Sequence, residues 1–146
     1  MTTYRISTAN HELDIPLIHD FISHSYWGKD VPQAVVEKAI KNSQCFGVFA
    51  DTGDQVGFAR VITDRATFAY LADVFILEAH RGKGLAKQLM AHIAEYPDLQ
   101  GLRRMMLATR DAHGLYAGCG FTPLANPDTF MEIWHPDVYQ TPVINE

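Results

Sequence analysis

The sequence has 146 residues, of which 47% are hydrophobic, and a formal net charge of −5. A chain of this length and composition is expected to fold as one domain, residues 1–146, around a single hydrophobic core. The acidic balance argues against the broad basic face that nucleic-acid-binding proteins present to phosphates. The sequence contains no apolar run long enough to cross a bilayer, and its polar first residues lack the hydrophobic core of a signal peptide. We therefore expect a cytoplasmic protein with neither a nucleic-acid nor a membrane partner.

The cysteine and histidine spacings do not predict a metal site. Cys45 and Cys119 lie far apart in the sequence and form no CxxC pair, so both are expected to be reduced thiols. His19 and His24 are five residues apart on a predicted helix. That spacing does not place them on one face of the helix.

Hydrophobic periodicity predicts a mixed α/β fold without an internal repeat. Apolar residues at helical spacing indicate helices, and runs of β-branched and aromatic residues indicate strands. The turn residues at 51–54 separate two strands and predict a hairpin. A proline at position 97 is expected to end the longest helix near Tyr96. The elements expected in chain order are a strand at 4–7, helices at 15–25 and 31–41, strands at 45–50, 56–63 and 67–77, a helix at 85–96, a strand at 103–109, a helix at 111–119 and a strand at 130–134.

The predicted strand at 67–77 carries a single charged residue, Asp73. Side chains alternate between the two faces of a strand, so regular alternation assigns each residue to one face. One face then carries Phe68, Tyr70, Ala72, Val74 and Ile76, and the other carries Leu71, Asp73, Phe75 and Leu77. Asp73 is thus a candidate functional acid, although a structural ion pair explains an isolated strand acid equally well.

A basic, glycine-containing turn connects this strand to the next predicted helix. It reads Arg81-Gly82-Lys83-Gly84-Leu85-Ala86. Two glycines allow close approach of a ligand to the backbone, and the first N–H groups of a helix have no intrahelical partner. Together with two basic side chains, these features predict a site for a phosphate or pyrophosphate. The turn lacks the third glycine of a dinucleotide fingerprint and the Gly-Lys-Ser/Thr of a Walker loop.

Two motifs make the sequence similar to the GNAT superfamily of N-acetyltransferases. The turn at 81–86 fits the family signature of Gln or Arg, two residues, Gly, one residue, then Gly or Ala, and the aliphatic Ile76 precedes it at the family's spacing. The second motif, Leu-Tyr followed by Gly-Phe, stands at 115–121 as Leu-Tyr-Ala-Gly-Cys-Gly-Phe. The resemblance implies a single-domain acyl-CoA N-acyltransferase fold, an α/β (α+β) domain with a mixed central sheet of about six to seven strands and helices on both faces.

The resemblance also implies acetyl-CoA as cosubstrate, bound where the fourth and fifth strands separate. Family members place a tyrosine beside the thioester sulfur, which implies a catalytic role for Tyr116 here. Many members have an asparagine seven residues before this tyrosine, where this chain has Thr109. The loop between the first two helices walls the acceptor pocket in the family, which implies Tyr26 and Trp27 here, and Tyr70 is a further candidate. The residues expected to bind the cofactor are Val74, Phe75, Ile76, Arg81, Gly82, Lys83, Gly84, Leu85, Ala86 and Thr109.

The chemistry of amine acetylation assigns roles to two of these side chains. A lysine-like amine attacks a thioester only when neutral, and deprotonating it at pH 7 costs roughly 4 to 5 kcal/mol. Asp73 is the leading candidate for the proton acceptor, directly or through water, with Tyr70 as second choice. Tyr116 is protonated at neutral pH and can donate a hydrogen bond to the departing thiolate.

The sequence thus predicts transfer of an acetyl group from acetyl-CoA to a primary amine by direct attack in a ternary complex. The acceptor is expected to be a small amine or a lysine-bearing substrate, and no metal is required. The alternative is a non-catalytic acyl-CoA sensor or interaction domain of the same fold, which Thr109 and the uncertain base keep open. Dimerisation is common in the resembled family, and the sequence leaves a homodimer open.

Overall fold

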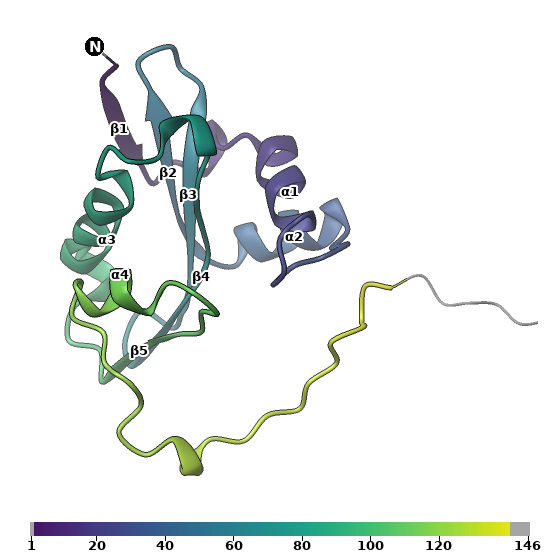
Figure 1. Ribbon diagram of the computed structural model, residues 1–146, viewed down its shortest axis with the longest axis vertical. Coiled ribbons are helices and arrows are strands. Elements are labelled where there is room, and N and C mark those ends of the chain that lie inside the picture. Colours follow the sequence, from purple (N-terminus) through teal and green to yellow (C-terminus); the bar gives the residue numbers. More distant parts are fainter. Residues whose placement is uncertain (1, 141–146) are drawn as a thin grey trace, which may run out of the picture.

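The computed structural model describes residues 2–140, which form a five-stranded mixed sheet with helices on both faces (Figure 1). The strands follow chain order across the sheet, with antiparallel pairing from β1 to β4 and parallel pairing between β4 and β5. This confirms the predicted fold class, although the count of six to seven strands was too high for this part of the chain. The strands are β1 (Tyr4–Ser7), β2 (Gln44–Ala50), β3 (Gln55–Thr63), β4 (Phe68–Ile76) and β5 (Arg104–Leu107).

The first helix begins and the third helix ends where local sequence signals predict. The carboxylate of Asp14 accepts a hydrogen bond from the Leu17 N–H at 3.1 Å and caps the first helix. The third helix ends directly before Tyr96-Pro97, because proline disfavours helical geometry in the preceding residue. The α-helices are α1 (Ile15–Ser23), α2 (Gln33–Lys41), α3 (Leu85–Glu95) and α4 (His113–Ala117), and short 3-10 turns occupy Asn10–Glu12, Glu78–His80, Pro97–Leu99 and Pro127–Thr129.

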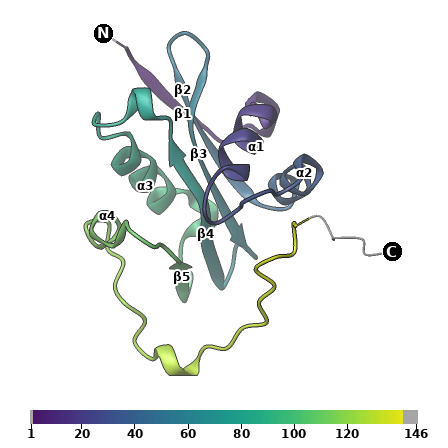
Figure 2. The ribbon, with the colours of Figure 1, turned by 45° about the vertical axis from the view of Figure 1, so that its right-hand side comes forward.

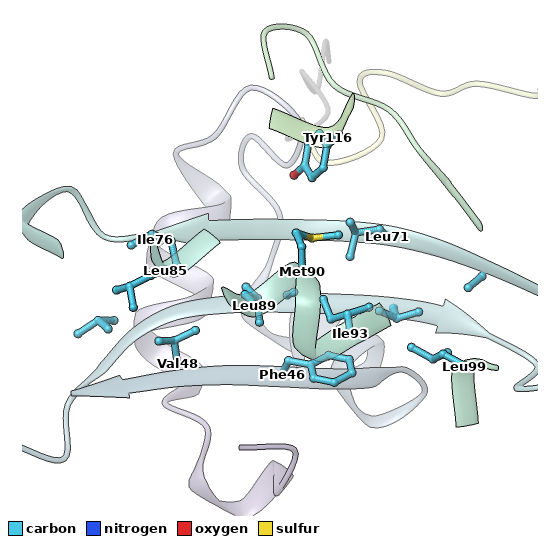
Figure 3. Close-up of a cluster of buried hydrophobic side chains, with 14 of the residues drawn as sticks. Phe46, Val48, Leu71, Ile76, Leu85, Leu89, Met90, Ile93, Leu99 and Tyr116 are labelled. Atoms are coloured by element: carbon cyan, nitrogen blue, oxygen red, sulfur yellow. The ribbon is translucent and has the colours of Figure 1, made fainter. Parts of the chain in front are cut away.

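Helices lie on both faces of the sheet (Figure 2), and a hydrophobic cluster lies under them on each face. On one face, α1 and α2 contribute Ile18 and Ile40 to a cluster with Phe58 and Phe75. On the other face, α3 packs its apolar stripe on the strands, and Figure 3 shows Tyr116 at the margin of this cluster, beyond β4. The residues that α3 buries are Leu85, Leu89, Met90 and Ile93.

A β-bulge at Asp73 breaks the regular alternation predicted for β4. Phe58 pairs with Phe75 and Arg60 pairs with Ala72, so two residues of β4 oppose one residue of β3. Asp73 accordingly has a φ of +54°, a left-handed conformation that is uncommon outside glycine. Ala69 and Leu71 face α3 before the bulge, and Val74 and Ile76 face it afterwards. The assignment of Val74 and Ile76 to the face opposite Leu71 was therefore wrong.

The predicted strand at 130–134 does not form within residues 2–140. The segment is exposed chain with no strand partner in the described structure. The predicted helix at 111–119 is shorter than expected, because only His113–Ala117 are helical. Among the helices of the described residues, none is long and apolar enough to cross a membrane.

Candidate acyl-CoA and acceptor site

A cleft opens where β4 and β5 separate. The two strands pair from Phe68↔Arg104 to Leu71↔Leu107, and β4 continues beyond that point to Ile76. The side of β4 from residue 72 to residue 76 that faces β5 thus has no strand partner in the described part of the chain. Unpaired strand backbone of this kind can hydrogen-bond an extended ligand as another strand would.

Two cavities, of about 820 and 640 Å³, occupy this cleft. The larger runs from the glycine turn and α3 towards α1, and the smaller lies between the bulged part of β4 and the loop after β5. Their walls share five residues, Tyr26, Trp27, Val74, Ala112 and Tyr116. The shared walls place the two cavities side by side.

The glycine turn forms one end of the larger cavity. Gly82 and Gly84 have φ values of +79° and +76°, and a Cβ built on either would meet no atom within 4 Å. These positions are therefore glycine because of backbone conformation and not because of crowding. Gly84 directly precedes α3, and the first N–H groups of this helix lie beside the cavity with Leu85 and Ala86 in its lining.

The two basic residues of the turn point in different directions. The Arg81 Nε donates to the main-chain oxygen of Ile76 at 2.9 Å, and Arg81 lines the larger cavity. The Lys83 Nζ instead donates to the Tyr4 hydroxyl at 3.2 Å, and Lys83 lines neither cavity. The motif predicted that Lys83 binds the ligand. In this arrangement its ammonium points to Tyr4 and away from both cavities.

Tyr116 occupies the wall common to both cavities. Its side chain is buried, and that burial raises the pKa of its phenol above the usual value, with the nearby Cys119 and Tyr26 adding to the effect. The spacing of the second motif follows from local packing, because the Phe121 N–H donates to the Tyr116 main-chain oxygen at 3.0 Å. The two rings also meet edge to face, with centroids 5.9 Å apart. The hydroxyl therefore stays protonated at neutral pH, and the contacts with Phe121 hold the main chain and the ring of Tyr116.

Asp73 is engaged by two partners. One carboxylate oxygen accepts from Arg60 Nε at 2.8 Å, and the other accepts from Trp27 Nε1 at 2.8 Å. The Arg60 and Asp73 side chains are only 16% and 12% exposed, so this is a largely buried ion pair. The structural alternative that the sequence left open is thus present. Through these two hydrogen bonds, Asp73 fixes the position of the Trp27 indole relative to the β-bulge. They also stabilise the left-handed conformation of Asp73 itself.

The residues predicted for the acceptor pocket, together with Asp73 and the predicted cofactor-binding Thr109, line the smaller cavity. Tyr70, Asp73 and Thr109 belong to its wall, and Tyr26 and Trp27 lie at its junction with the larger cavity. Tyr26 spans the cleft, since its hydroxyl accepts from the Arg110 N–H at 2.9 Å and the Arg110 guanidinium lies 4.0 Å from its ring centroid. The Thr109 Oγ1 accepts from the Ala112 N–H at 3.1 Å, which positions the chain before α4.

Three further residues of these walls were missed by sequence reasoning. Arg60 and Arg110 reach the smaller cavity through long-range contacts that no local pattern indicates. His24 lines the larger cavity, and its Nδ1 bonds the main-chain oxygen of Asp20 at 2.7 Å. Since a carbonyl only accepts, the Nδ1 must carry the proton, and in the neutral ring Nε2 is then an acceptor. The position of His24 in the predicted helix did not indicate that it lines a cavity.

A family model for the acetyltransferase (GNAT) family matches residues 15–121, which include the glycine turn and the tyrosine motif. The chain belongs to the GNAT acetyltransferase family. A solved structure from Xanthomonas campestris pv. campestris, described as a candidate acetyltransferase of this family, is 56% identical with a TM-score of 0.92, covering 95% of this chain and 98% of that one. A candidate acetyltransferase of Gibberella zeae is 34% identical over 135 residues, 77% of this chain and 75% of the relative.

The fold also matches N-acetylglutamate synthase from Neisseria gonorrhoeae, solved with coenzyme A and N-acetylglutamate. The TM-score is 0.67 at 20% identity, over 86% of this chain and 30% of that one. At this level of identity the likeness shows a common fold and nothing about substrate. Acetyl-CoA is the acyl donor of the GNAT family.

Proposed function

We propose that this protein transfers an acetyl group from acetyl-CoA to a primary amine by direct attack in a ternary complex. The observation that carries the proposal is the pair of adjoining cavities with Tyr116 in their common wall. Direct transfer needs two substrates bound at once with their reacting atoms in contact. The larger cavity reaches the glycine turn, and the smaller cavity adjoins the larger one at the buried Tyr116 phenol. This arrangement supports binding of two substrates at once.

The residues of the larger cavity fit coenzyme A. Its pyrophosphate would bind the turn at 81–86. There the first N–H groups of α3 can donate to an anion, and the two glycines leave room for it. The pantetheine arm would run along the unpaired side of β4 at Val74, Phe75 and Ile76. The thioester that this donor supplies is the electrophile of the reaction. Main-chain N–H groups at Val74 or Phe75 are the proposed donors to the carbonyl oxygen as negative charge develops there.

Tyr116 is the proposed donor to the departing thiolate. Because burial raises its pKa, the phenol is a weaker acid than a free thiol near 8.5. It therefore stabilises the thiolate by hydrogen bonding and does not transfer its proton completely. Direct transfer assisted by this hydrogen bond needs no covalent enzyme intermediate.

Besides Tyr70, the second choice from sequence, which lines the smaller cavity, two groups are candidates for the proton acceptor. Asp73 was the prediction from sequence, but its two oxygens already accept from Arg60 and Trp27, which supports a positioning role for this carboxylate. His24 has an acceptor nitrogen at the wall of the larger cavity. Asp73→Asn and His24→Asn separate the two, because loss of the true base removes the acidic limb from the pH profile of kcat/KM.

The acceptor is proposed to be a primary amine on a small molecule or a lysine side chain, bound in the smaller cavity. Tyr26, Trp27 and Tyr70 supply aromatic walls that suit a cationic or apolar amine. The acidic net charge of the chain favours encounter with cations.

Release of free thiol from acetyl-CoA against a panel of amines tests the proposal. The expected result is thiol release that depends on acceptor and yields the acetylated amine. The rival function is a non-catalytic acyl-CoA sensor. Coenzyme A binding by calorimetry, without release of thiol from acetyl-CoA in the presence of any amine, would favour that rival.

A further inference from the structure

A hydrogen-bonded network of three side chains lies behind the glycine turn. The Lys83 Nζ donates to the Tyr4 hydroxyl at 3.2 Å, and that hydroxyl lies 2.9 Å from His80 Nδ1. The Tyr4 and His80 rings meet edge to face, with centroids 5.7 Å apart. His80 lines the larger cavity, whereas Tyr4 and Lys83 line neither cavity. The network therefore reaches the cavity through His80.

Both ends of the Tyr4–His80 contact are held by main-chain structure. Tyr4 belongs to β1, where it pairs with Ala50 of β2, and its ring packs against the hydrophobic cluster under α3. His80 ends the 3-10 turn Glu78–His80, and its main-chain N–H donates to the Leu77 oxygen at 2.9 Å. Side chains on such elements are positioned more precisely than side chains on free loops. The contact thus fixes the His80 ring relative to the first strand of the sheet.

The direction of these hydrogen bonds follows from which groups carry protons. A lysine ammonium only donates, so the Tyr4 oxygen accepts from Lys83. The phenol proton is then free to donate to His80 Nδ1. If Nδ1 donated instead, the phenol would accept twice, and its own proton would have no partner within residues 2–140. The arrangement that satisfies every group makes Nδ1 the acceptor, so the proton of the neutral imidazole is on Nε2.

The Nε2–H of His80 is available to a ligand. The two nitrogens of an imidazole point in divergent directions, so Nε2 faces away from Tyr4. No hydrogen bond joins Nε2 to another group within residues 2–140, and no buried side-chain nitrogen or oxygen in this part of the chain lacks a partner. Nε2 is therefore accessible, in a residue that forms part of the wall of the larger cavity.

The larger cavity thus contains two histidines with opposite roles. His24 bonds the Asp20 main-chain oxygen through Nδ1, which leaves Nε2 as an acceptor in the neutral ring. His80 accepts at Nδ1 and presents a donor at Nε2. An acceptor nitrogen suits the removal of a proton, and a donor suits the binding of an anion. Neutral His80 is therefore suited to an anionic part of the ligand and not to the acceptor amine.

The charges around His80 also suit an anion. Arg81 follows His80 in the chain, and Lys87 lies one turn into α3; both line the larger cavity. Among the described residues that line this cavity, the one acid is Asp20, which lies on α1 with its carboxylate 3.7 Å from His24. A phosphate oxygen beside His80 would accept from the Nε2–H in a positively charged environment, and hydrogen bonds to ionised acceptors are the strong ones.

We propose that His80 binds a phosphate group of coenzyme A through its Nε2–H, and that Tyr4 and Lys83 are positioning residues that hold this tautomer. This inference rests on the proposed function, because it requires coenzyme A in the larger cavity. It gives Lys83 a role without direct ligand contact, since the lysine acts through Tyr4 and His80. The diphosphate and the 3′-phosphate of coenzyme A share this chemistry, and dephospho-coenzyme A, which lacks the 3′-phosphate, distinguishes them.

Titration calorimetry of coenzyme A with the full-length protein tests the role of His80. His80→Asn should raise the dissociation constant about tenfold or more, the value of a hydrogen bond to a charged group. His80→Gln, whose amide N–H can lie near the place of the Nε2–H, should recover most of that loss. With dephospho-coenzyme A, the loss in His80→Asn should persist if His80 binds the diphosphate and disappear if it binds the 3′-phosphate. The matched control is His92→Asn, since His92 is exposed on α3, lines neither cavity and should leave the affinity unchanged.

Tyr4→Phe tests positioning separately from packing, because it removes the hydroxyl and keeps the ring. Nitrogen-15 NMR of the histidine rings, at about pH 8 where free imidazole is neutral, reports the tautomer. The unmodified protein should have the His80 proton on Nε2, and Tyr4→Phe should give a mixture of both tautomers. Because only the Nε2–H fraction binds the phosphate, the dissociation constant for coenzyme A should rise about twofold or more. Tyr96→Phe is the matched control, since Tyr96 lines neither cavity, and it should change neither quantity.

Two results would overturn the role of His80. One is a His80→Asn variant that binds coenzyme A as tightly as the unmodified protein, and the other is a His80 proton found on Nδ1 of the unmodified protein. Neither result would affect the proposed acetyl transfer if thiol release from acetyl-CoA still depends on an amine. Failure of the unmodified protein to bind coenzyme A would instead contradict the proposed function itself.

Discussion

Replacing Gly84 by alanine should weaken both coenzyme A binding and the fold. Gly84 has a φ of +76°, and an added Cβ would contact nothing in the protein, so the cost is purely conformational. Holding a residue with a Cβ in the left-handed region costs roughly 1–2 kcal/mol. The free energy of unfolding should fall by about that amount, because the glycine adopts this conformation without strain.

Coenzyme A binding should be weakened as well. The turn of the free variant can relax away from the ligand-binding conformation, and binding must then reverse that change. We expect the dissociation constant for coenzyme A to rise about tenfold or more, equivalent to at least 1.4 kcal/mol. Titration calorimetry measures it. Gly101→Ala is the matched control, since Gly101 has a φ of +72°, also faces open space and lines neither cavity. Equal losses of coenzyme A affinity in the two variants, or no loss in Gly84→Ala, would refute the assignment of this turn.

Four further substitutions test the remaining roles. Tyr116→Phe should lower kcat about 10- to 100-fold, the value of a hydrogen bond to a charged group, while coenzyme A affinity changes little; an unchanged kcat would remove Tyr116 from the reaction. Arg81→Ala should instead raise the dissociation constant for coenzyme A, and calorimetry showing wild-type affinity would contradict this. Asp73→Asn should destabilise the fold by about 3 kcal/mol, because the largely buried Arg60 loses its counter-charge; thermal melting at wild-type temperature would argue against a structural ion pair. The Asp64 carboxylate accepts hydrogen bonds from Thr67 and nearby main-chain N–H groups, which lower its pKa. These bonds therefore add to the free energy of unfolding above the unfolded-state pKa near 4, and this stabilisation is lost as the pH falls below that value. Asp64→Asn should therefore reduce stability in urea at pH 7 and flatten its decline in acid, and parallel profiles for both proteins would contradict this.

The parts of the site that depend on local chemistry were predictable from the sequence. The glycine turn was identified because only glycine adopts positive φ freely, and Gly82 and Gly84 do so. The cap at Asp14 and the end of α3 before Pro97 follow from similarly local rules. The tyrosine motif was recognised by its spacing, and the Tyr116–Phe121 contact gives the physical reason for that spacing.

The parts that depend on distant contacts were not predictable in the same way. The bulge at Asp73 arises from pairing with β3 and from bonds to Arg60 and Trp27, which lie 13 and 46 residues away. Alternation along β4 alone could not reveal it. Lys83 similarly turns to Tyr4, 79 residues distant, instead of the cleft.

The strand predicted at 130–134 illustrates a different limit. Alternation and composition describe what a segment can form, but a strand also needs an edge to pair with. The described chain offers the edge of β5 and does not bring the segment to it.

We propose that the two adjoining cavities form one catalytic site for acetyl transfer. The most direct measurement is mass spectrometry of an amine panel incubated with acetyl-CoA and either the wild-type protein or Tyr116→Phe, with free thiol followed in parallel. We predict an acetylated amine formed in equal amount to the thiol, at a rate that falls with the substitution while coenzyme A still binds. Tight binding of acetyl-CoA without acetylation of any amine, or equal rates for the two proteins, would contradict the account.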